Sequence, residues 1–297
     1  MWIFTAFLGP FFHSAANILD SHLTNDLFKR KSTLIFYATL FGFLFVPLLF
    51  LFGFPRIPGN ETFLIYCAIA VINVGYLYPY YKALEGSDTS IVTSLFSIGN
   101  LFVPILAYFI VGEVLTPIQY VGVIMVVITS IMLGIEKGTT FKLSSAFWWM
   151  LLCSFILSLE AVLYKYSFIS EDWITSFFWP ALLSLVLVLP FLFFTQSRSD
   201  IVSNRKRFIQ KFPIFGLEEF ATFLGSSAGT YATSVAPVTI VSIIGETQAL
   251  FVLLWAKAFG KHASFSMKEN MDSKSISRKI ILFVLMVAAI ALVLWGK

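Results

Sequence analysis

Four carboxylates stand inside long apolar stretches in the second half of this chain: Glu160, Glu218, Glu219 and Glu246. Removal from water disfavours the charged form of a carboxyl group, so such a group can accept a proton from one side of a barrier and release it to the other. The same group could instead pair with an amine or quaternary ammonium group on a substrate. A single carboxylate that does both would couple protons to substrate by competition.

Two of these carboxylates are adjacent in the chain. Neighbouring side chains on a helix point roughly 100° apart, so we expect one of Glu218 and Glu219 to line a path and the other to reach toward the membrane interface. For the other two carboxylates the alternative is a buried hydrogen bond between helices. Lys165 follows Glu160 closely enough for an ion pair, although Lys165 and Asp20 end their apolar stretches at equivalent positions and are expected to be interfacial anchors.

Six further side chains complete the candidate set for substrate and proton binding: His13, Asn17, Tyr76, Tyr80, Asn100 and Gln248. The first two share a helix face at a spacing of four residues, and so do the two tyrosines. The tyrosine rings could hold a cation, a contact that contributes ~0.5–2 kcal/mol when desolvated. Asn100 lies in the first half and Gln248 in the second, and their amides could bind a polar substrate or hold two helices together. The alternatives are a hydrogen-bonded core histidine and tyrosines that only pack or lie at the interface.

The composition places these residues in a bilayer. Of the 297 residues, 58% are hydrophobic and 12% are charged, whereas a water-soluble domain carries roughly 25% charged residues. A helix needs roughly 20 apolar residues to cross the hydrocarbon core. Ten such stretches are predicted: residues 2–20, 33–52, 63–84, 91–111, 117–135, 145–168, 174–195, 214–235, 238–259 and 280–295. The predicted fold class is therefore an all-α integral membrane protein with ten transmembrane helices.

The positions of the basic residues predict an orientation. With ten spans, 17 of the 20 Lys and Arg residues lie on one side, and only Arg56, Lys165 and Lys297 lie on the other. Because cytoplasmic loops are enriched in Lys and Arg, both termini are expected on the non-cytoplasmic side of the plasma membrane. The basic side is expected to contact anionic lipid headgroups. Nucleic acid is not an expected partner, because the basic residues are spread over five loops without a recognition motif.

The two halves of the chain resemble each other. Residues 90–93 (SIVT) align with residues 239–242 (TIVS), and the apolar stretches that follow run in parallel register. Five predicted helices then fall in residues 1–137 and five in residues 138–297. An odd number of spans per repeat inverts the second copy in the membrane, an arrangement typical of alternating-access carriers. The alternative is a chance similarity between two apolar sequences.

A short motif supports a family resemblance. Its residues are Gly112, Glu113, Leu115, Thr116, Gln119 and Gly122. With its surroundings it resembles the third to fifth helices of an EamA-type repeat of the drug/metabolite transporter superfamily, although Lys261 replaces the acid in the second copy. The resemblance implies a secondary carrier of small metabolites. Many such carriers are described with cytoplasmic termini, and the charge distribution of this chain predicts the reverse.

Part of the motif also has a structural interpretation. Thr116 followed by Pro117 is a good N-cap and first-turn pair, so this stretch is expected to begin a helix. Glu113 is then placed at the interface, where a packing or capping role is favoured over a role in transport.

These features predict a secondary active transporter of a small amphiphilic metabolite, such as an amine or amino acid, with proton coupling as a hypothesis. We expect no catalytic residue, metal or cofactor, because the three histidines and two cysteines lack metal-ligand spacing and no glycine-rich phosphate loop is present. The expected partners are the substrate, protons and membrane lipids, in a monomer or homodimer. The alternatives are an intramembrane enzyme that acts on a lipid or headgroup, and a membrane scaffold.

Overall fold

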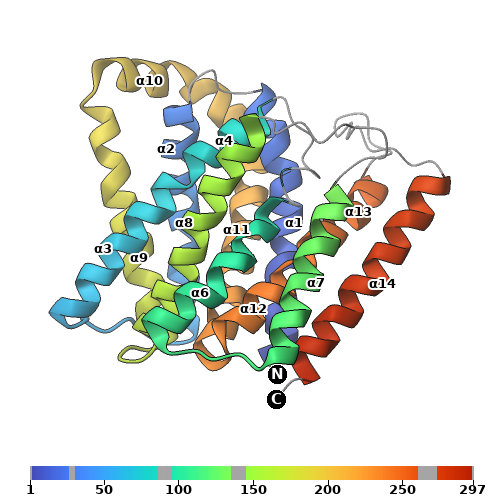
Figure 1. The fold of residues 1–297 in the computed structure, drawn as a ribbon. Helices are drawn as coiled ribbons and strands as arrows, with labels where there is room; N and C mark the ends of the chain where they lie inside the picture. The colour runs from blue at the N-terminus through green and yellow to red at the C-terminus, as the bar shows by residue number, and fades with distance from the viewer. Residues whose placement is uncertain are drawn as a thin grey trace.

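The computed structural model describes residues 2–26, 31–85, 92, 95–134, 145–259 and 273–295. Most of segment 90–93 and residue Lys261 lie outside these ranges. Within the described residues every regular element is a helix (Figure 1). Five helices are long and apolar enough to cross a membrane, namely Trp2–Asp20, Lys31–Leu51, Asn60–Leu84, Ser145–Ser167 and Trp173–Leu192, and four shorter apolar helices accompany them. The prediction of an all-α membrane fold is confirmed to this extent.

The helices follow the predicted apolar stretches closely in most places. The first half contains α1 (Trp2–Asp26), α2 (Lys31–Phe45), η1 (Val46–Leu51), α3 (Asn60–Gly75), α4 (Leu77–Leu84), η2 (Phe96–Ile98), α6 (Gly99–Val111) and α7 (Pro117–Gly134). The second half contains α8 (Ser145–Ser167), α9 (Trp173–Val188), η3 (Leu189–Leu192), α10 (Thr195–Gln210), α11 (Phe212–Val235), α12 (Val238–Gly245), α13 (Gln248–Phe259) and α14 (Ser273–Trp295).

Two stretches that were expected to be continuous helices are each divided in two. The first divides at Tyr76, between α3 and α4. Pro79 explains this break, because its ring excludes a normal helical contact with the carbonyl of Gly75 four residues earlier. The second divides at Glu246 and Thr247, whose backbone N–H groups donate to carbonyls only three residues back, with N–O distances of 3.1 Å. Both breaks line the cavity described below, and irregular backbone in a membrane protein is tolerated where the chain lines a cavity.

One helix was not predicted. α10 is polar and connects α9 to α11, and Figure 1 shows it at the end of the molecule opposite the two termini. It is anchored by Tyr37 of α2, whose hydroxyl donates to the carbonyl of Ile201 at 2.7 Å and whose ring stacks on Phe208 with centroids 4.0 Å apart. A search for apolar stretches cannot find such a helix, because only one face of it is buried.

An ion pair joins two helices at the same end of the molecule. Lys31, at the start of α2, lies 2.7 Å from a carboxylate oxygen of Glu85, directly after α4. Lys82 lies 3.0 Å from the other oxygen. The two ammonium groups hold the pKa of Glu85 below its ordinary value, despite its partial burial. The hydrogen bond from Lys31 makes the largest contribution.

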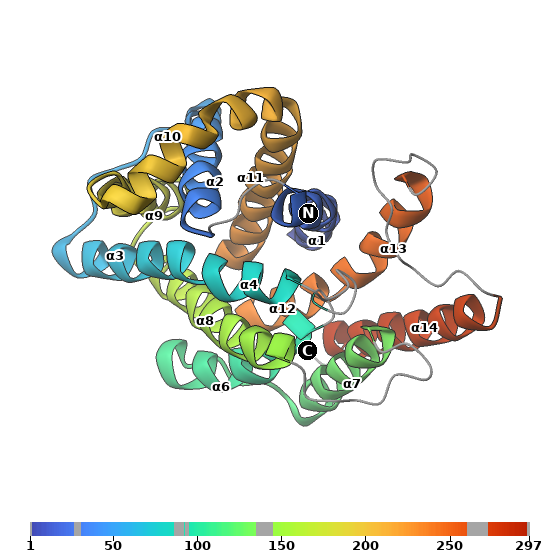
Figure 2. The ribbon, with the colours of Figure 1, turned by 90° about the horizontal axis from the view of Figure 1, so that it is seen from above.

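Small residues bring α1 and α11 close together. A Cβ atom on Gly9 would lie 3.5 Å from the carbonyl oxygen of Gly225 and 3.6 Å from Cα of Gly229. Seen from above, α1 stands beside α11, while α7 and α14 form a separate pair at the edge of the molecule (Figure 2). Close backbone approach of this kind is a common way to pack helices in lipid, where no hydrophobic effect drives them together.

The α7–α14 pair depends on Gly122 of the sequence motif, and its substitution is a test of the fold. A Cβ atom on Gly122 would lie 2.4 Å from Cγ2 of Val293 and 3.1 Å from the carbonyl oxygen of Ala289. We therefore expect Gly122→Ala to lower the melting temperature of the purified protein in detergent. Gly216→Ala is the matched control, because its Cβ would meet nothing within 4 Å and alanine favours a helix by ~1 kcal/mol over glycine. Equal melting temperatures for the two variants would contradict this packing.

Candidate substrate cavity

A cavity of about 510 Å³ lies between the two halves of the chain. Its walls come from α1, α2, α3, α4, α6, α8, α9, α11, α12 and α13. All ten side chains of the predicted site line it, so residues spread from His13 to Gln248 are brought to one place. Among the described lining residues there is no Lys or Arg. The acidic side chains of the lining are Asp20, Glu160, Glu218, Glu219 and Glu246.

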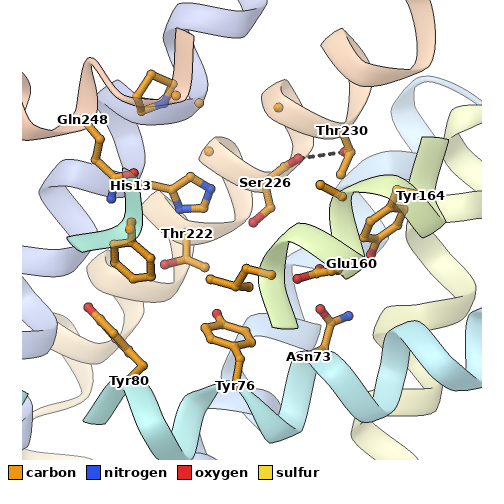
Figure 3. Close-up of a pocket in the computed structure, with 18 of the residues that line it drawn as sticks. His13, Asn73, Tyr76, Tyr80, Glu160, Tyr164, Thr222, Ser226, Thr230 and Gln248 are labelled. Carbon is orange, nitrogen blue, oxygen red and sulfur yellow. Dashed lines mark hydrogen bonds between the residues drawn. The ribbon is translucent and has the colours of Figure 1, made fainter. Parts of the chain in front are cut away.

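Glu160 extends from α8 into the open cavity (Figure 3). Tyr76 and Tyr164 lie within electrostatic range of its carboxylate. No described residue donates a hydrogen bond to it. The ion pair with Lys165, which the sequence left open as an alternative, is not observed: the Lys165 ammonium donates to backbone carbonyls at the end of α11. Five residues on a helix turn through roughly 500°, so the two side chains point about 140° apart.

Glu246 is held in a different way. It lies at the break between α12 and α13 and is 8% exposed. Its Oε1 accepts a hydrogen bond from Nδ2 of Asn100 on α6, and its Oε2 accepts one from Oγ of Ser130 on α7 at 2.9 Å. The amide of Asn100 therefore contacts a carboxylate of the other half. Ser130 was not predicted, because a single serine in an apolar stretch gives no signal. These bonds are the interhelical hydrogen bonds that were the alternative to a role in transport.

The other amide has a different setting. Gln248 follows the break at the start of α13 and also lines the cavity. In the close-up it is drawn beside His13 of α1 (Figure 3). His13 itself packs against α11, since a Cβ atom on Gly225 would lie 2.9 Å from Cδ2 of the imidazole. The two amides thus have different neighbours, Glu246 for Asn100 and His13 for Gln248.

Both Glu218 and Glu219 face the cavity, so the expectation that only one would do so is wrong. They are 3% and 6% exposed. Glu218 accepts a hydrogen bond from Oγ1 of Thr222 at 3.0 Å. Glu219 lies against α2, where a Cβ atom on Gly42 would be 2.9 Å from its Oε2. The cavity extends around α11 toward α2, so side chains 100° apart on one helix can both reach it.

Asp20 joins these two glutamates, and sequence reasoning misplaced it. It was expected at the interface, yet α1 continues to Asp26 and Asp20 is only 7% exposed. Electrostatic interaction links its carboxylate to Glu218 and Glu219. We refer to Asp20, Glu218 and Glu219 as the acidic triad. The segment that follows Asp20 is polar but can continue the helix as far as Asp26. This continuation was the feature of the sequence that could have placed Asp20 within the helix bundle.

Tyr80 and Asn17 border the acidic triad. The Tyr80 hydroxyl lies 3.0 Å from Oδ1 of Asn17 and 3.2 Å from Oδ2 of Asp20, and a single O–H group cannot donate fully to both. Asn17 is 8% exposed, and its Nδ2 has no hydrogen-bond partner among the described residues. In this corner of the cavity there are therefore more hydrogen-bond acceptors than the Tyr80 hydroxyl can satisfy, and the N–H donors of the Asn17 amide have no partner among the described residues.

Aromatic rings form the wall between the triad and Glu160. Tyr76 and Tyr80 point from one face into the cavity, as predicted from their spacing (Figure 3). Tyr80 also contacts Tyr81 and Phe96, with ring centroids 5.4 and 5.7 Å apart. Such faces suit an apolar or cationic ligand. Among the described residues, no group of three His, Cys, Asp or Glu side chains is arranged to hold a metal ion.

The Gly-Glu motif lies outside the cavity and supports its wall. Gly112 ends α6 with φ 68°, a conformation that favours glycine. The next residue, Glu113, accepts hydrogen bonds from the backbone N–H groups of Val238 at 2.9 Å and Thr239 at 3.0 Å. The expected capping role is thus observed, and the helix capped is α12 of the other half. Thr116 and Pro117 begin α7, as predicted.

Comparison with known proteins agrees with this fold. No curated protein matches the chain. A solved structure described only as "Crystal structure of protein" is similar over 98% of this chain and 95% of its own, with a TM-score of 0.62 and 16% sequence identity, a likeness that concerns the fold alone. Residues 1–135 match the EamA-like transporter family. The predicted resemblance is confirmed over these residues: the first 135 residues of this integral membrane protein match the EamA-like transporter family of the drug/metabolite transporter superfamily.

Proposed function

We propose that this protein is a secondary transporter that carries a small amphiphilic amine, or a related organic cation, across the plasma membrane. The observation that carries this proposal is the charge of the cavity, whose described lining has five carboxylates and neither Lys nor Arg. Buried carboxylates without basic partners favour a cationic ligand, because an ammonium group supplies the missing charge and hydrogen bonds. The aromatic walls would receive the apolar part of such a ligand.

The direct ligand for the ammonium group is Glu160 in this proposal. Its carboxylate faces the cavity and accepts no hydrogen bond from the described residues, so an incoming donor replaces water and displaces no protein partner. Glu246 differs, because Asn100 and Ser130 already occupy its two oxygens. Protons compete with the substrate at the same carboxylates, and this competition would couple the two fluxes.

Alternating access between residues 1–137 and 138–297 is the proposed mechanism. The packing supports two related halves: α1 packs on α11, and its counterpart α8 packs on α3 and α4. In the same way α6 packs on α8, and α13 packs on α1. In Figure 1, α1 runs away from the end that holds the termini and α8 runs toward it, as expected for an inverted pair. The five spans, the four shorter apolar helices and α11 would supply ten crossings.

The orientation remains the one proposed from the charges. α10 lies at the end of the molecule opposite the termini (Figure 1) and carries Arg198, Arg205 and Lys206. A basic amphipathic helix suits the anionic cytoplasmic surface. Both termini would then face away from the cytoplasm.

Flux measurements in proteoliposomes test the function. We expect protein-dependent uptake of labelled phenyltrimethylammonium, a permanent cation that does not leak through lipid. It has no N–H group, so it tests the attraction of the cavity for positive charge alone. Uptake should be faster when the vesicle interior is more acidic than the outside, because protons then leave as the cation enters. Excess unlabelled phenylethylamine should compete, and 3-phenylpropionate, similar in size but anionic, should not. Equal competition by the anion, or no flux of any organic cation, would reject the proposal. Covalent turnover of the probe or of lipid in sealed vesicles would favour the enzyme alternative instead.

A further inference from the structure

Four of the five acidic groups of the cavity, all except Glu246, are divided between two places. The acidic triad borders Tyr80 of α4, whose hydroxyl contacts Asp20. Glu160 instead lies toward Asn73 of α3, with Tyr76 between the two places (Figure 3). The Tyr76 hydroxyl lies within electrostatic range of Glu160, Asp20 and Glu219. The cavity therefore presents two separate anionic ends joined by an aromatic wall.

The triad end lacks a ligand for its acceptors. All three carboxylates are more than nine-tenths buried. Glu218 and Glu219 share a side-chain hydrogen bond, and the described donors from outside the triad are Tyr80 and Thr222. Asn17, also more than nine-tenths buried, directs an unpartnered amide into the same corner. Buried polar groups are nearly always paired, so an unpaired amide beside excess acceptors indicates a missing polar ligand.

The separation of the two ends restricts the ligand. Asn73 and Tyr80 are seven residues apart along α3 and α4, which corresponds to roughly 10 Å of helix rise. The wall between them is formed by Tyr76, Leu77 and Phe96. A chain of methylene groups can lie along such a wall, whereas a polar linker would lose hydrogen bonds there.

We propose that the preferred substrate is a linear diamine, with one ammonium group at the acidic triad, the other at Glu160, and the aliphatic chain along the aromatic wall. This inference rests on the proposed transport of organic cations and adds the second binding point. One ammonium group would donate to Glu160, which has no described donor, and the other would donate to triad oxygens that Tyr80 and Thr222 leave unpaired. The Asn17 amide would complete the triad end through its contact with the bound group or an accompanying water.

Two probes of equal length separate one charge from two. The probes are 1,8-diaminooctane and 8-amino-1-octanol, which differ in that a hydroxyl replaces one ammonium group. We expect calorimetric titration of the purified full chain to show at least about tenfold tighter binding of the diamine. In a series from 1,4-diaminobutane to 1,8-diaminooctane, affinity should rise with length. Equal affinity for the two octane probes, or no dependence on length, would overturn the proposal.

Substitutions then identify the two ends. Asp20→Asn and Glu160→Gln should each abolish the tighter binding of the diamine relative to 8-amino-1-octanol. In the Asp20 variant, the affinity for 8-amino-1-octanol should change less than about threefold. Glu219→Gln provides a second variant of the triad end if Asp20→Asn fails to fold, which melting curves would reveal. Equal weakening of both probes by the triad variants would contradict a second ammonium site.

The outcomes distinguish this inference from the function on which it rests. Glu160-dependent transport of single-charge cations, without any preference for diamines, would remove the inference and leave the proposed function intact. Failure of every organic cation to bind or move would remove both.

Discussion

Replacement of Glu160 by glutamine is expected to reduce the uptake of phenyltrimethylammonium by at least about tenfold, with little change in melting temperature. The physical reason is that the Glu160 carboxylate accepts no hydrogen bond from the described protein and faces the cavity. In the proposed transporter, its charge would contribute to ligand binding and not to packing. Glutamine has the same shape, so the substitution removes the charge and leaves the cavity wall unchanged.

A matched control makes this prediction specific. Glu61→Gln changes a charge at the exposed start of α3 and should transport at the parental rate. Glu160→Gln should also lose the response of uptake to a pH gradient, measured in the same proteoliposomes. If this variant and Glu246→Gln both retain the rate and proton dependence of the parent, the carboxylates are not the coupling groups.

Most of the candidate site could be predicted from the sequence because the membrane makes polar residues conspicuous. A carboxylate or amide in an apolar stretch requires a cavity or partner, and all seven carboxylates and amides selected on this principle line one cavity. The principle does not say whether a given side chain faces the open cavity or is bonded to a partner. Glu246 found partners in Asn100 and Ser130 and Glu160 did not, a difference set by how α6 and α7 pack against α12.

The errors have a common cause in the treatment of boundaries. Asp20 was assigned to the interface because the apolar stretch ends there, but α1 extends to Asp26 and carries Asp20 into the cavity. α10 was missed because it has no continuous apolar stretch, and the breaks at Tyr76 and Glu246 were missed because each stretch is apolar and long enough to be predicted as one continuous helix. Apolar length locates a segment in the membrane, whereas tertiary contacts decide where its helix begins, breaks and ends.

The loop between α11 and α12 is held from both sides by charged groups. Glu113 accepts hydrogen bonds from the N–H groups of Val238 and Thr239 at the start of α12. Lys165 donates to the carbonyls of Thr233 at 2.9 Å and Ala236 at 2.8 Å at the end of α11. Each charge is opposite in sign to the helix terminus that it contacts, which adds a favourable interaction with the helix dipole. The position of α12, and with it that of Glu246, depends on this clamp.

Glu113→Ala is therefore expected to lower the melting temperature of the purified protein by roughly 5 °C or more, because two hydrogen bonds to a charged acceptor are lost and two backbone donors are left unpaired. Glu113→Gln should lie between this variant and the parent, since one amide oxygen can accept but the NH₂ group cannot. Transport should fall in the same order, because α12 carries the chain to Glu246 in the cavity wall. If Glu113 acted in transport by its charge alone, both variants would instead lose activity equally and keep the parental melting temperature.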